Sequence, residues 1–407
     1  MWGLKKAYNR TFQFVFNIGA RCLPWRRAEA AEGAGSIARI PELLAREGRR
    51  HPMVVTDRGL MTCGVAPRIL EVLDAAGVEY ALFDRVEANP TVAMVEDIHT
   101  RYLREGCDSF IAVGGGSHMD AAKAAAARIV RPTKEVNQLG GLLKVRRRIP
   151  TFIAVPTTAG TGSETTIAAL ITDPATHHKY AIMDLALIPR YAVLDAELTV
   201  GLPPHITAAT GMDALTHAVE AYLCWTYNTK ESLRCAREAV KTIFANLERV
   251  YRDGSDLAAR EAMLRASFQA GFAFTRAGVG NVHAIAHTLG GLYNTAHGLA
   301  NAVILPIVLE DYGSAVYPKL AQLAQLAGVA REGDSEEENA KAFIAAIRAM
   351  NQRMGIPVGF DFIREEDIPQ MVAWAGKEAN PIYPVPVLYS PERFRAVIEK
   401  IRIQPEQ

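Results

Sequence analysis

Short apolar runs alternate with helical patterns between Glu47 and Asp195, and this alternation constrains the fold more than any other feature of the chain. Strands that alternate with helices predict a parallel sheet joined by crossover helices. The runs expected to be buried strands are Met53–Asp57, Tyr80–Asp84, Ser109–Gly116, Thr151–Pro156 and Tyr191–Asp195. Helical patterns between the first of them cover Ala66–Ala76 and Thr91–Glu105. Residues 47–202 are therefore predicted to form an α/β domain.

From Pro203 onward the strand signals fade and Ala-rich helical patterns replace them. The clearest patterns are Ile206–Leu223, Ser232–Val250, Leu257–Phe274, Val282–Tyr293, Ala300–Leu309 and Tyr317–Ala327. A chain of 407 residues is long enough for two domains, since single cores stop growing near about 250–300 residues. We expect a basic extension and lead-in over residues 1–46, the α/β domain over 47–202 and an all-helical domain over 203–407.

Charge and cysteine content exclude several classes of protein. The formal net charge is +1, so no overall field favours a nucleic-acid partner. The five cysteines are odd in number and scattered, so neither a disulfide framework nor a thiolate zinc site is expected. No run of about 18 apolar residues predicts a membrane-spanning helix. A reducing cytoplasm is the expected location.

The first 27 residues are basic and contain no acid. A signal peptide fits poorly, because Gln13 and Asn17 interrupt the apolar run. A basic amphipathic segment fits better, and it has three candidate partners: the rest of its own protein, a second subunit, or a membrane surface. The basic residues are Lys5, Lys6, Arg10, Arg21, Arg26 and Arg27.

Two glycine- and hydroxyl-rich loops follow predicted strands. In "FIAVGGGSHMDAAKAAA" three glycines stand between a strand and a helix start. Glycines let backbone amides approach a pyrophosphate, and the helix N-terminus adds partial positive charge. The GxGxxG fingerprint is absent, so a tight turn is the competing interpretation. The second loop, "AVPTTAGTGSETT" (Ala154–Thr166), can hydrogen-bond phosphate and ribose, and a capping turn is its competing interpretation. Because both loops fall at the carboxyl edge of a parallel sheet, together they favour a nucleotide site.

Asp57 ends the first of the five predicted strands. A carboxylate there can accept hydrogen bonds from a ribose hydroxyl and repel a 2′-phosphate, which favours NAD over NADP. A helix N-cap is the competing role.

A cluster of histidines lies in "NVHAIAHTLGGLYNTAHG". His283 and His287 are four residues apart and share a helix face, as do Asp213 and His217 in "GMDALTHAVEAY". A satisfied polar pair in the core is the bland interpretation of either pair. With His297 added, imidazole and carboxylate donors suit Zn, Fe(II), Mn or Ni in a site for Lewis-acid catalysis. Five candidate donors are one more than such a site needs.

Four segments together resemble the iron-containing (group III) alcohol dehydrogenase family. They are "TAATGMDALTHAVEAY", "HAIAHTLGGLYNTAHGLANAVILP", "GGGSHMDAAK" and "PTTAGTGSE". The resemblance runs from about Met53 to the C-terminus. It implies a nicotinamide-dependent alcohol/aldehyde oxidoreductase with an N-terminal α/β domain, a helical C-terminal domain and an active site in the cleft between them. It also implies NAD(H), one divalent metal (Fe(II), with Zn as the alternative), a small alcohol or aldehyde as substrate, and a homodimer or larger homo-oligomer.

The resemblance assigns roles residue by residue. The metal ligands would be Asp213, His217, His283 and His297. His287 would lie beside the metal without binding it and relay a proton, which completes the catalytic set. The residues matching the dinucleotide site of the family are Asp57, Asn89, Gly115, Gly116, Ser117, Asp120, Thr157, Thr158, Thr166, Lys179 and Leu198.

Three departures from the family pattern stand out. His118 and Ala296 each replace a common proline, and the basic N-terminal extension is absent from typical members. Two other enzyme classes remain as alternatives. A lyase of the dehydroquinate synthase type shares the layout but needs several basic side chains for a phosphorylated substrate, and only Lys179 and Arg276 stand out here. A metal-dependent hydrolase uses the same ligand types, but the two phosphate-type loops oppose it.

Overall fold

The computed structural model describes residues 2–173 and 178–403, with side chains described only outside residues 173–179. The chain divides into two compact units. The helical unit consists of Met1–Leu23 with Leu202–Gln407, and the α/β unit is Pro24–Gly201. Residues 1–46 were expected to form a separate lead-in, but the structure divides them between the two units. Their first part is a helix of the helical unit, whereas their second part supplies a strand and a helix to the α/β unit.

Within the described part of the α/β unit, a parallel sheet of six strands has the order β1-β9-β6-β4-β2-β3. Neighbouring strands are in matched register, with Val54 opposite Ile111 and Ile111 opposite Ile153. All five predicted strands are present, and β1 is an additional strand. The six strands are β1 (Glu29–Glu32), β2 (Pro52–Val55), β3 (Ala81–Phe83), β4 (Ser109–Gly114), β6 (Thr151–Pro156) and β9 (Tyr191–Leu194).

A smaller sheet was not expected from the sequence. Its order is β5-β8-β7, and β7 pairs with β8 in antiparallel fashion. These strands are β5 (Gly141–Leu142), β7 (Ala168–Asp173) and β8 (His178–Met183).

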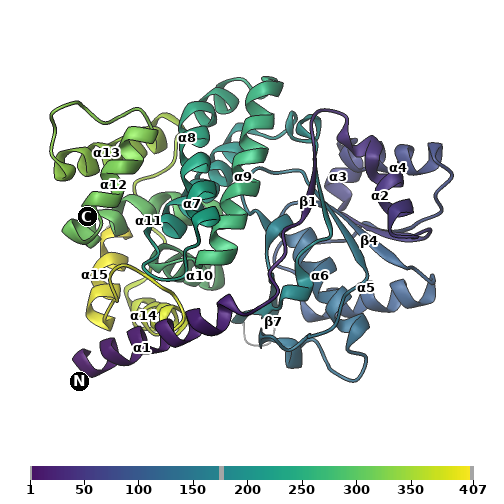
Figure 1. Cartoon of the computed structure of the whole chain (residues 1–407), viewed down its shortest axis with the longest axis horizontal. Helices are drawn as coiled ribbons and strands as arrows, with labels where there is room; N and C mark the ends of the chain where they lie inside the picture. The colour runs from purple at the N-terminus through teal and green to yellow at the C-terminus, as the bar shows by residue number, and fades with distance from the viewer. Residues whose placement is uncertain (1, 174–177, 404–407) are drawn as a thin grey trace. The chain divides into compact units, whose positions relative to one another are not determined.

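Helices cover both faces of the six-stranded sheet (Figure 1). Because side chains alternate along a strand, Phe110 and Ala112 face one core, whereas Ile111 and Val113 face the other. The first core lies against α5 and α6, and the second against α2 and α4. The helices of this unit are α2 (Ile40–Arg46), α3 (Arg58–Thr62), α4 (Val65–Ala75), α5 (Val92–Arg104) and α6 (Gly116–Val130), with short 3₁₀ turns η1 (Ser36–Arg39), η2 (Asn137–Leu139), η3 (Ser163–Thr165), η4 (Leu185–Leu187) and η5 (Ala196–Thr199).

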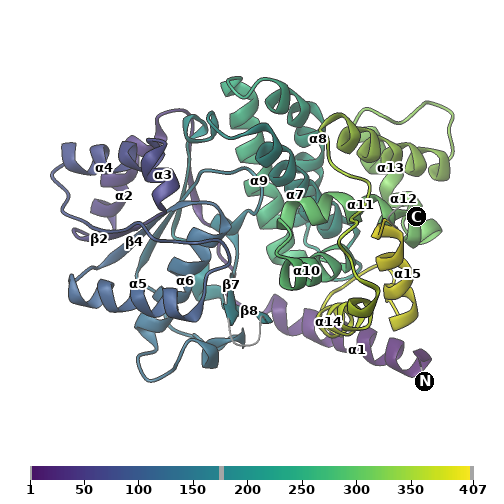
Figure 2. The same cartoon turned by 180° about the vertical axis from the view of Figure 1, so that it is seen from behind.

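The helical unit confirms the predicted succession of helices after Pro203. At its centre α7 packs against α8, α9 and α11, and α10 packs against α11 and α14 (Figure 2). The helices are α1 (Trp2–Arg21), α7 (Pro204–Leu223), α8 (Lys230–Arg252), α9 (Leu257–Ala277), α10 (Asn281–Tyr293), α11 (His297–Tyr312), α12 (Tyr317–Leu326), α13 (Glu336–Arg353), α14 (Ile368–Ala379) and α15 (Pro391–Ile401), with 3₁₀ turns η6 (Gly313–Ala315) and η7 (Glu365–Asp367).

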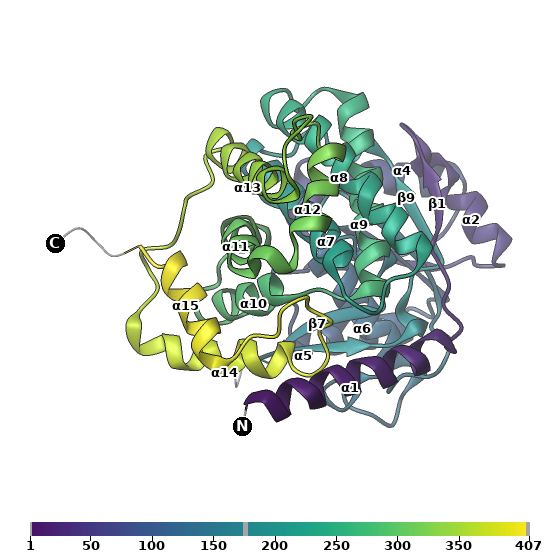
Figure 3. The same ribbon diagram turned by 60° about the vertical axis from the view of Figure 1, so that its left-hand side comes forward.

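The basic N-terminal segment forms helix α1, which lies beside α14 (Figure 3). It docks on its own unit, which was one of the three partners considered for it. Among the described residues, no helix is long and apolar enough to cross a membrane.

Candidate metal centre and cofactor-binding edge

Asp213, His217, His283 and His297 come together in the helical unit. Each offers one donor atom, and the four donor atoms lie within 4.8 Å of one another. The Asp213 Oδ1 atom is 3.6 Å from His297 Nε2 and 4.0 Å from Nε2 of both other histidines. The sequence placed two of these residues on one helix, and the structure adds one donor from α10 and one from the start of α11.

Close packing of α7 and α11 makes this convergence possible. Nearly all side chains of α7 from Thr207 onward are buried, so its polar donors face inward rather than toward water. Helix α11 begins at His297, and the next residue is Gly298. A Cβ atom at Gly298 would lie 2.2 Å from the carbonyl oxygen of Ala209 on α7. Only glycine therefore lets the start of α11 approach α7 this closely.

Glu220, one turn beyond His217 on α7, holds His283 in place. Its Oε2 atom is 2.6 Å from His283 Nδ1 and accepts a hydrogen bond of 2.8 Å from the backbone N–H of Gly280. Its Oε1 atom accepts a bond of 2.8 Å from the N–H of Val282. With Nδ1 donating to the carboxylate, the lone pair of His283 lies on Nε2, the atom that faces Asp213. Glu220 was not singled out in the sequence, although it shares a helix face with Asp213 and His217.

Burial sets the protonation of this cluster. It lowers the pKa of His283 well below the usual value, and the neighbouring histidines lower it further. Burial raises the pKa of Glu220, whereas the backbone N–H groups of Gly280 and Val282 lower it and favour the carboxylate that His283 contacts. A neutral imidazole is the form that binds metals, so the environment keeps His283 ready as a ligand.

The amide group of Asn301 lies at the point on which the donors converge. Its Nδ2 atom is 2.7 Å from Asp213 Oδ1 and 3.2 Å from Nε2 of both His283 and His297. The Asn301 N–H group thus occupies a position surrounded by acceptor atoms from a carboxylate and imidazoles. The same carboxylate and imidazole atoms are suitable ligands for a divalent cation such as Fe(II) or Zn. Asn301 is four residues after His297 on α11, so helical spacing could have predicted that it faces the same site.

His287 lies next to this group but outside it. Its ring stacks on that of His297, with centroids 5.1 Å apart, and meets that of His283 edge-on at 6.0 Å. Its Nδ1 atom is 2.5 Å from Oε1 of Glu378 on α14, which also accepts a bond of 2.6 Å from the hydroxyl of Tyr383. No local pattern reveals Glu378, which is 91 residues away along the chain.

Most of the predicted cofactor residues lie at one edge of the α/β unit. The carboxyl ends of parallel neighbours meet at the same edge of a sheet. The residues after β2, β3, β4, β6 and β9 are therefore brought to a common edge. These residues are Asp57, Asn89, Gly115, Gly116, Ser117, Thr157, Thr158 and Leu198.

The two glycine- and hydroxyl-rich loops lie against each other. A Cβ atom at Gly115 would lie 3.4 Å from Thr158 Oγ1, and one at Gly116 would lie 3.1 Å from the Thr161 side chain. Gly114 has a positive φ of 147°, and a Cβ atom there would lie 2.3 Å from the ring of His118. Helix α6 begins at Gly116, so its first backbone N–H groups face this turn.

Asp57 caps helix α3, as the competing interpretation predicted. Its Oδ1 atom accepts a bond of 2.9 Å from the N–H of Leu60, and its Oδ2 atom is 2.5 Å from His118 Nε2. The hydrogen bond with His118 lowers the pKa of Asp57, so this carboxyl stays charged at neutral pH. His118, one of the departures from the family pattern, is thus the partner of Asp57.

Two predicted cofactor residues are bonded within the fold. Asp120 accepts hydrogen bonds from Ser163 Oγ at 3.0 Å and from the N–H of Leu170 at 3.1 Å. Thr166 Oγ1 accepts a bond of 2.9 Å from Nζ of the buried Lys123, which was not expected from the sequence. Lys179 is on β8, and its side chain lies outside the described residues. Asp120, Thr166 and Lys123 therefore hold the second loop in shape.

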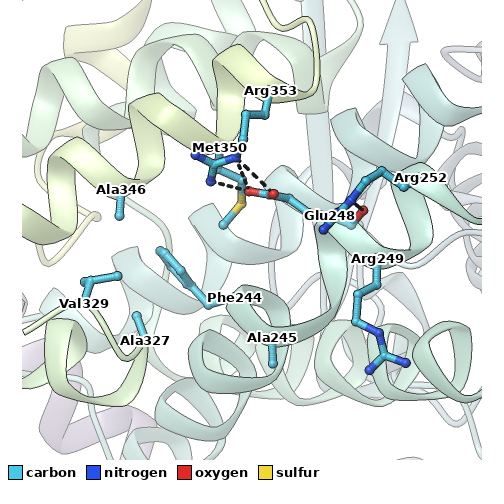
Figure 4. Close-up of a pocket in the computed structure, with 10 residues that line it drawn as sticks. All are labelled: Phe244, Ala245, Glu248, Arg249, Arg252, Ala327, Val329, Ala346, Met350 and Arg353. Atoms are coloured by element: carbon cyan, nitrogen blue, oxygen red, sulfur yellow. Dashed lines mark hydrogen bonds and ion pairs between the residues drawn. The ribbon is translucent and has the colours of Figure 1, made fainter.

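A surface pocket of about 280 Å³ in the helical unit contains none of these residues (Figure 4). Two of its arginines are paired: Arg353 with Glu248 at 3.0 Å and Arg249 with Asp256 at 2.6 Å. The pocket is lined by Phe244, Ala245, Glu248, Arg249, Arg252, Ala327, Val329, Ala346, Met350 and Arg353. We assign it no part in the chemistry.

Known proteins resemble both units. The family model described as "Iron-containing alcohol dehydrogenase" matches residues 28–196, and the model of its C-terminal part matches residues 207–401. The chain is 36% identical over 348 residues to lactaldehyde reductase of Escherichia coli (strain K12), covering 83% of this chain and 89% of the relative. It is 39% identical over 354 residues to 1,3-propanediol dehydrogenase of Klebsiella pneumoniae, covering 86% and 90%. A crystal structure of a 1,3-propanediol oxidoreductase matches 94% of this chain and 100% of its own, with a TM-score of 0.89 and 36% identity.

Proposed function

The chain belongs to the iron-containing alcohol dehydrogenase family, and from this premise we propose how its residues carry out the reaction. It is an NAD-dependent oxidoreductase of alcohols and aldehydes that works with a divalent metal. The reported relatives are dehydrogenases and reductases, so neither the lyase nor the hydrolase alternative is favoured. The observation that carries the residue assignment is the convergence of one carboxylate and three imidazoles within 4.8 Å.

We propose that Asp213, His217, His283 and His297 hold the metal, with Fe(II) as the first candidate and Zn as the second. When bound, the cation supplies a Lewis acid for the oxygen of the alcohol or carbonyl group. Glu220 fixes the tautomer of His283 through Nδ1, which keeps Nε2 free to bind the cation. Asp213, His217 and His283 are buried, which limits the access of water to the centre, and His297 forms its more exposed side.

His287 is proposed to carry the proton. Its Nδ1 atom is bonded to Glu378, which leaves Nε2 as the atom that exchanges a proton with the substrate hydroxyl. Glu378 and Tyr383 orient the ring, as the third member of a catalytic relay does.

The cofactor is proposed to bind at the carboxyl edge of the six-stranded sheet. The pyrophosphate would meet the backbone N–H groups of Gly115, Gly116 and Ser117 at the start of α6, where the helix dipole favours negative charge. Asp57 would accept a hydrogen bond from the adenosine ribose and thereby favour NAD over NADP.

The substrate is proposed to be a small alcohol or its aldehyde or ketone. Two of the reported relatives are named for three-carbon compounds with two oxygens, lactaldehyde and 1,3-propanediol, so short diols and hydroxyaldehydes are the first to test. We also propose a homo-oligomer. All five cysteines are free, which supports the proposal of a reducing compartment such as the cytoplasm.

Spectroscopic measurement of NAD reduction tests this assignment. The purified protein is stripped with a chelator, reloaded separately with Fe(II) and Zn, and assayed against ethanol, 1,2-propanediol and 1,3-propanediol. We expect NADH to form only in metal-loaded samples, and fastest with one of the diols. NADH formation by chelator-treated protein shown by elemental analysis to lack metal would contradict the metal's role.

A further inference from the structure

Helix α1 is fixed to the helical unit by its polar side chains. Asn9, Gln13 and Asn17 are spaced four residues apart, so they form one stripe, and all three are buried. Asn9 Nδ2 donates to Asn380 Oδ1 at 2.8 Å, and Asn17 Nδ2 donates to the carbonyl oxygen of Thr226 at 2.8 Å. The docked face of this helix is therefore its hydrogen-bonding face.

The bonds of Gln13 and Arg10 show how specific this docking is. Gln13 Nε2 donates to the carbonyl oxygens of Pro381 and Tyr383 at 2.9 and 2.7 Å, and Gln13 Oε1 accepts from Trp225 Nε1 at 2.7 Å. The Arg10 guanidinium donates to the carbonyl oxygens of Val385 and Pro386 and lies 4.8 Å from the centre of the Trp225 ring. Each amide atom of Gln13 thus has a partner from the docking surface.

The opposite face of α1 is apolar and exposed. Its large side chains are exposed by 80% at Leu4, 63% at Tyr8, 57% at Phe14, 61% at Val15 and 54% at Ile18. Leu4, Tyr8, Val15 and Ile18 follow a spacing of three, four or seven residues, so they form one stripe along the helix. A surface helix normally buries its apolar side chains. In α1 the half-buried Phe16 packs on Tyr227 beside the buried amides, but the stripe of Leu4, Tyr8, Val15 and Ile18 is left exposed. An exposed apolar stripe of this kind marks an interaction surface.

The charges beside this stripe select its partner. Lys5 and Arg21 flank the stripe near the two ends of α1 and are exposed, and no acid occurs before Glu29. If the stripe paired with its own counterpart in a second copy, the two basic helices would repel each other. An anionic surface, by contrast, attracts these cations while apolar side chains enter its outer layer.

We propose that the exposed face of α1 (Leu4, Lys5, Tyr8, Phe14, Val15, Ile18 and Arg21) docks the enzyme on an anionic lipid surface. The 20-residue helix is about 30 Å long. It would lie in the plane of the interface, with its apolar side chains about 5–10 Å deep. The buried amide stripe keeps α1 attached to its unit while the opposite face contacts lipid.

Flotation of the full-length protein with vesicles tests the proposal. Vesicles of phosphatidylcholine alone are compared with vesicles containing phosphatidylglycerol, at low and high salt. We expect binding to the anionic vesicles only, and weaker binding at high salt. The double variant Lys5→Glu, Arg21→Glu should reduce binding by at least roughly fivefold for each basic residue changed. The double variant Val15→Ser, Ile18→Ser should also reduce it.

Val358→Ser is the matched control for the apolar change, because Val358 is 78% exposed on the same unit but far from α1 in the sequence. This control should bind like the wild type. All these variants should retain NAD reduction, since α1 contributes none of the residues assigned to the reaction. Circular dichroism checks that α1 stays folded in each.

Several outcomes would overturn the proposal. Absence of binding to anionic vesicles, or equal binding by the Val15→Ser, Ile18→Ser variant, would exclude docking through this face. Light scattering of the same samples gives a further check. If the wild type forms an oligomer that this variant does not form, a second copy of the chain covers the stripe and the lipid proposal is wrong.

Discussion

The candidate metal centre and the cofactor-binding edge position their polar groups by different means. In the helical unit the donors are side chains within or at the start of packed helices, and other side chains such as Glu220 and Asn301 bond to them. At the edge of the α/β unit the groups follow the ends of strands, and glycines present backbone N–H groups there. Side chains thus define the first site, whereas backbone geometry defines much of the second.

This difference predicts how each site responds to substitution. Removing a buried metal-donor side chain takes away one ligand of the cation. It also leaves the groups that hydrogen-bonded to that side chain unpaired in the core. At the edge, most of the binding to phosphate comes from backbone groups that no side-chain change removes. Substitutions of the metal ligands should therefore abolish metal binding and NAD reduction, whereas substitutions at the edge should shift the preference between NAD and NADP.

The largest effect is expected for His217→Ala. Loss of one of the four donors should remove most of the bound metal and the NAD-reducing activity, a greater loss than the roughly 10–100-fold caused by removing an outer partner of a ligand. Elemental analysis after dialysis measures the metal content. His205→Ala is the matched control, because His205 is on the same helix but exposed. Full metal occupancy in His217→Ala would mean that this residue is no ligand.

His287→Ala should keep the metal and lower turnover. Loss of an acid–base group costs roughly 10²–10⁴-fold at most. Steady-state kinetics across a range of pH would also show a changed profile. Glu378→Gln, which removes the charge behind His287, should cause a smaller loss of turnover. If His287→Ala instead lost as much metal as His283→Ala, His287 would belong among the ligands.

Glu220→Gln should weaken metal binding without changing the size of the side chain. The amide has one acceptor oxygen for two backbone N–H groups, so one of them would be left unpaired, at a cost of about 1–3 kcal/mol. We expect metal affinity to fall by roughly 10–100-fold. A chelator competition titration measures the affinity, and thermal unfolding measures the stability. Glu238→Gln, an exposed glutamate on α8, should change neither.

The smallest effect is expected at the cofactor edge, for Asp57→Gly. The wild type should favour NAD, and the variant should lose much of that preference, by about tenfold in the ratio of kcat/KM values, or about 1.4 kcal/mol. Because His118 lies 2.5 Å from the carboxylate, it already offsets part of the repulsion of a 2′-phosphate. Equal use of both cofactors by the wild type would show that Asp57 does not discriminate.

Two further measurements separate charge from capping at Asp57. Asp57→Asn keeps an N-cap acceptor for Leu60, so it should change the cofactor ratio with little loss of stability. The pKa of Asp57 is lowered, so the carboxyl is charged above that lowered value and becomes neutral only as the pH falls through it. The NAD preference due to this charge should therefore stay constant between about pH 6 and pH 8.

Much of the fold could be predicted because periodicity encodes it. The four inner strands are buried on both faces, and they and the edge strand β3 appear as short apolar runs, whereas β1 reads "EAAE". As an edge strand with exposed glutamates, β1 carries no such run, so it was not expected. The small sheet was missed as well, since β5 has only two residues and β8 begins with "HKY".

The candidate site was predictable only where helical spacing links its residues. Asp213 and His217 share a face of α7 by their spacing, and His283, His287 and His297 were candidates from one cluster of histidines. The family resemblance then set His287 apart from the four ligands. Glu378 reaches His287 only through the packing of α14 on α10, which no local pattern records. The surface on which α1 docks could not be predicted for a similar reason, because Gln13 bonds to carbonyl oxygens of a loop that is distant in the sequence.

Glu220 has a further consequence for the order in which the metal centre forms. Helix α10 has no side-chain cap of its own, and the N–H groups of Gly280 and Val282 at its start are satisfied from α7 instead. The first turn of α10 is therefore held in place by a group other than the cation. Metal uptake should then require little additional ordering of the chain, and the amide hydrogen of Val282 should exchange slowly with solvent even in metal-free enzyme.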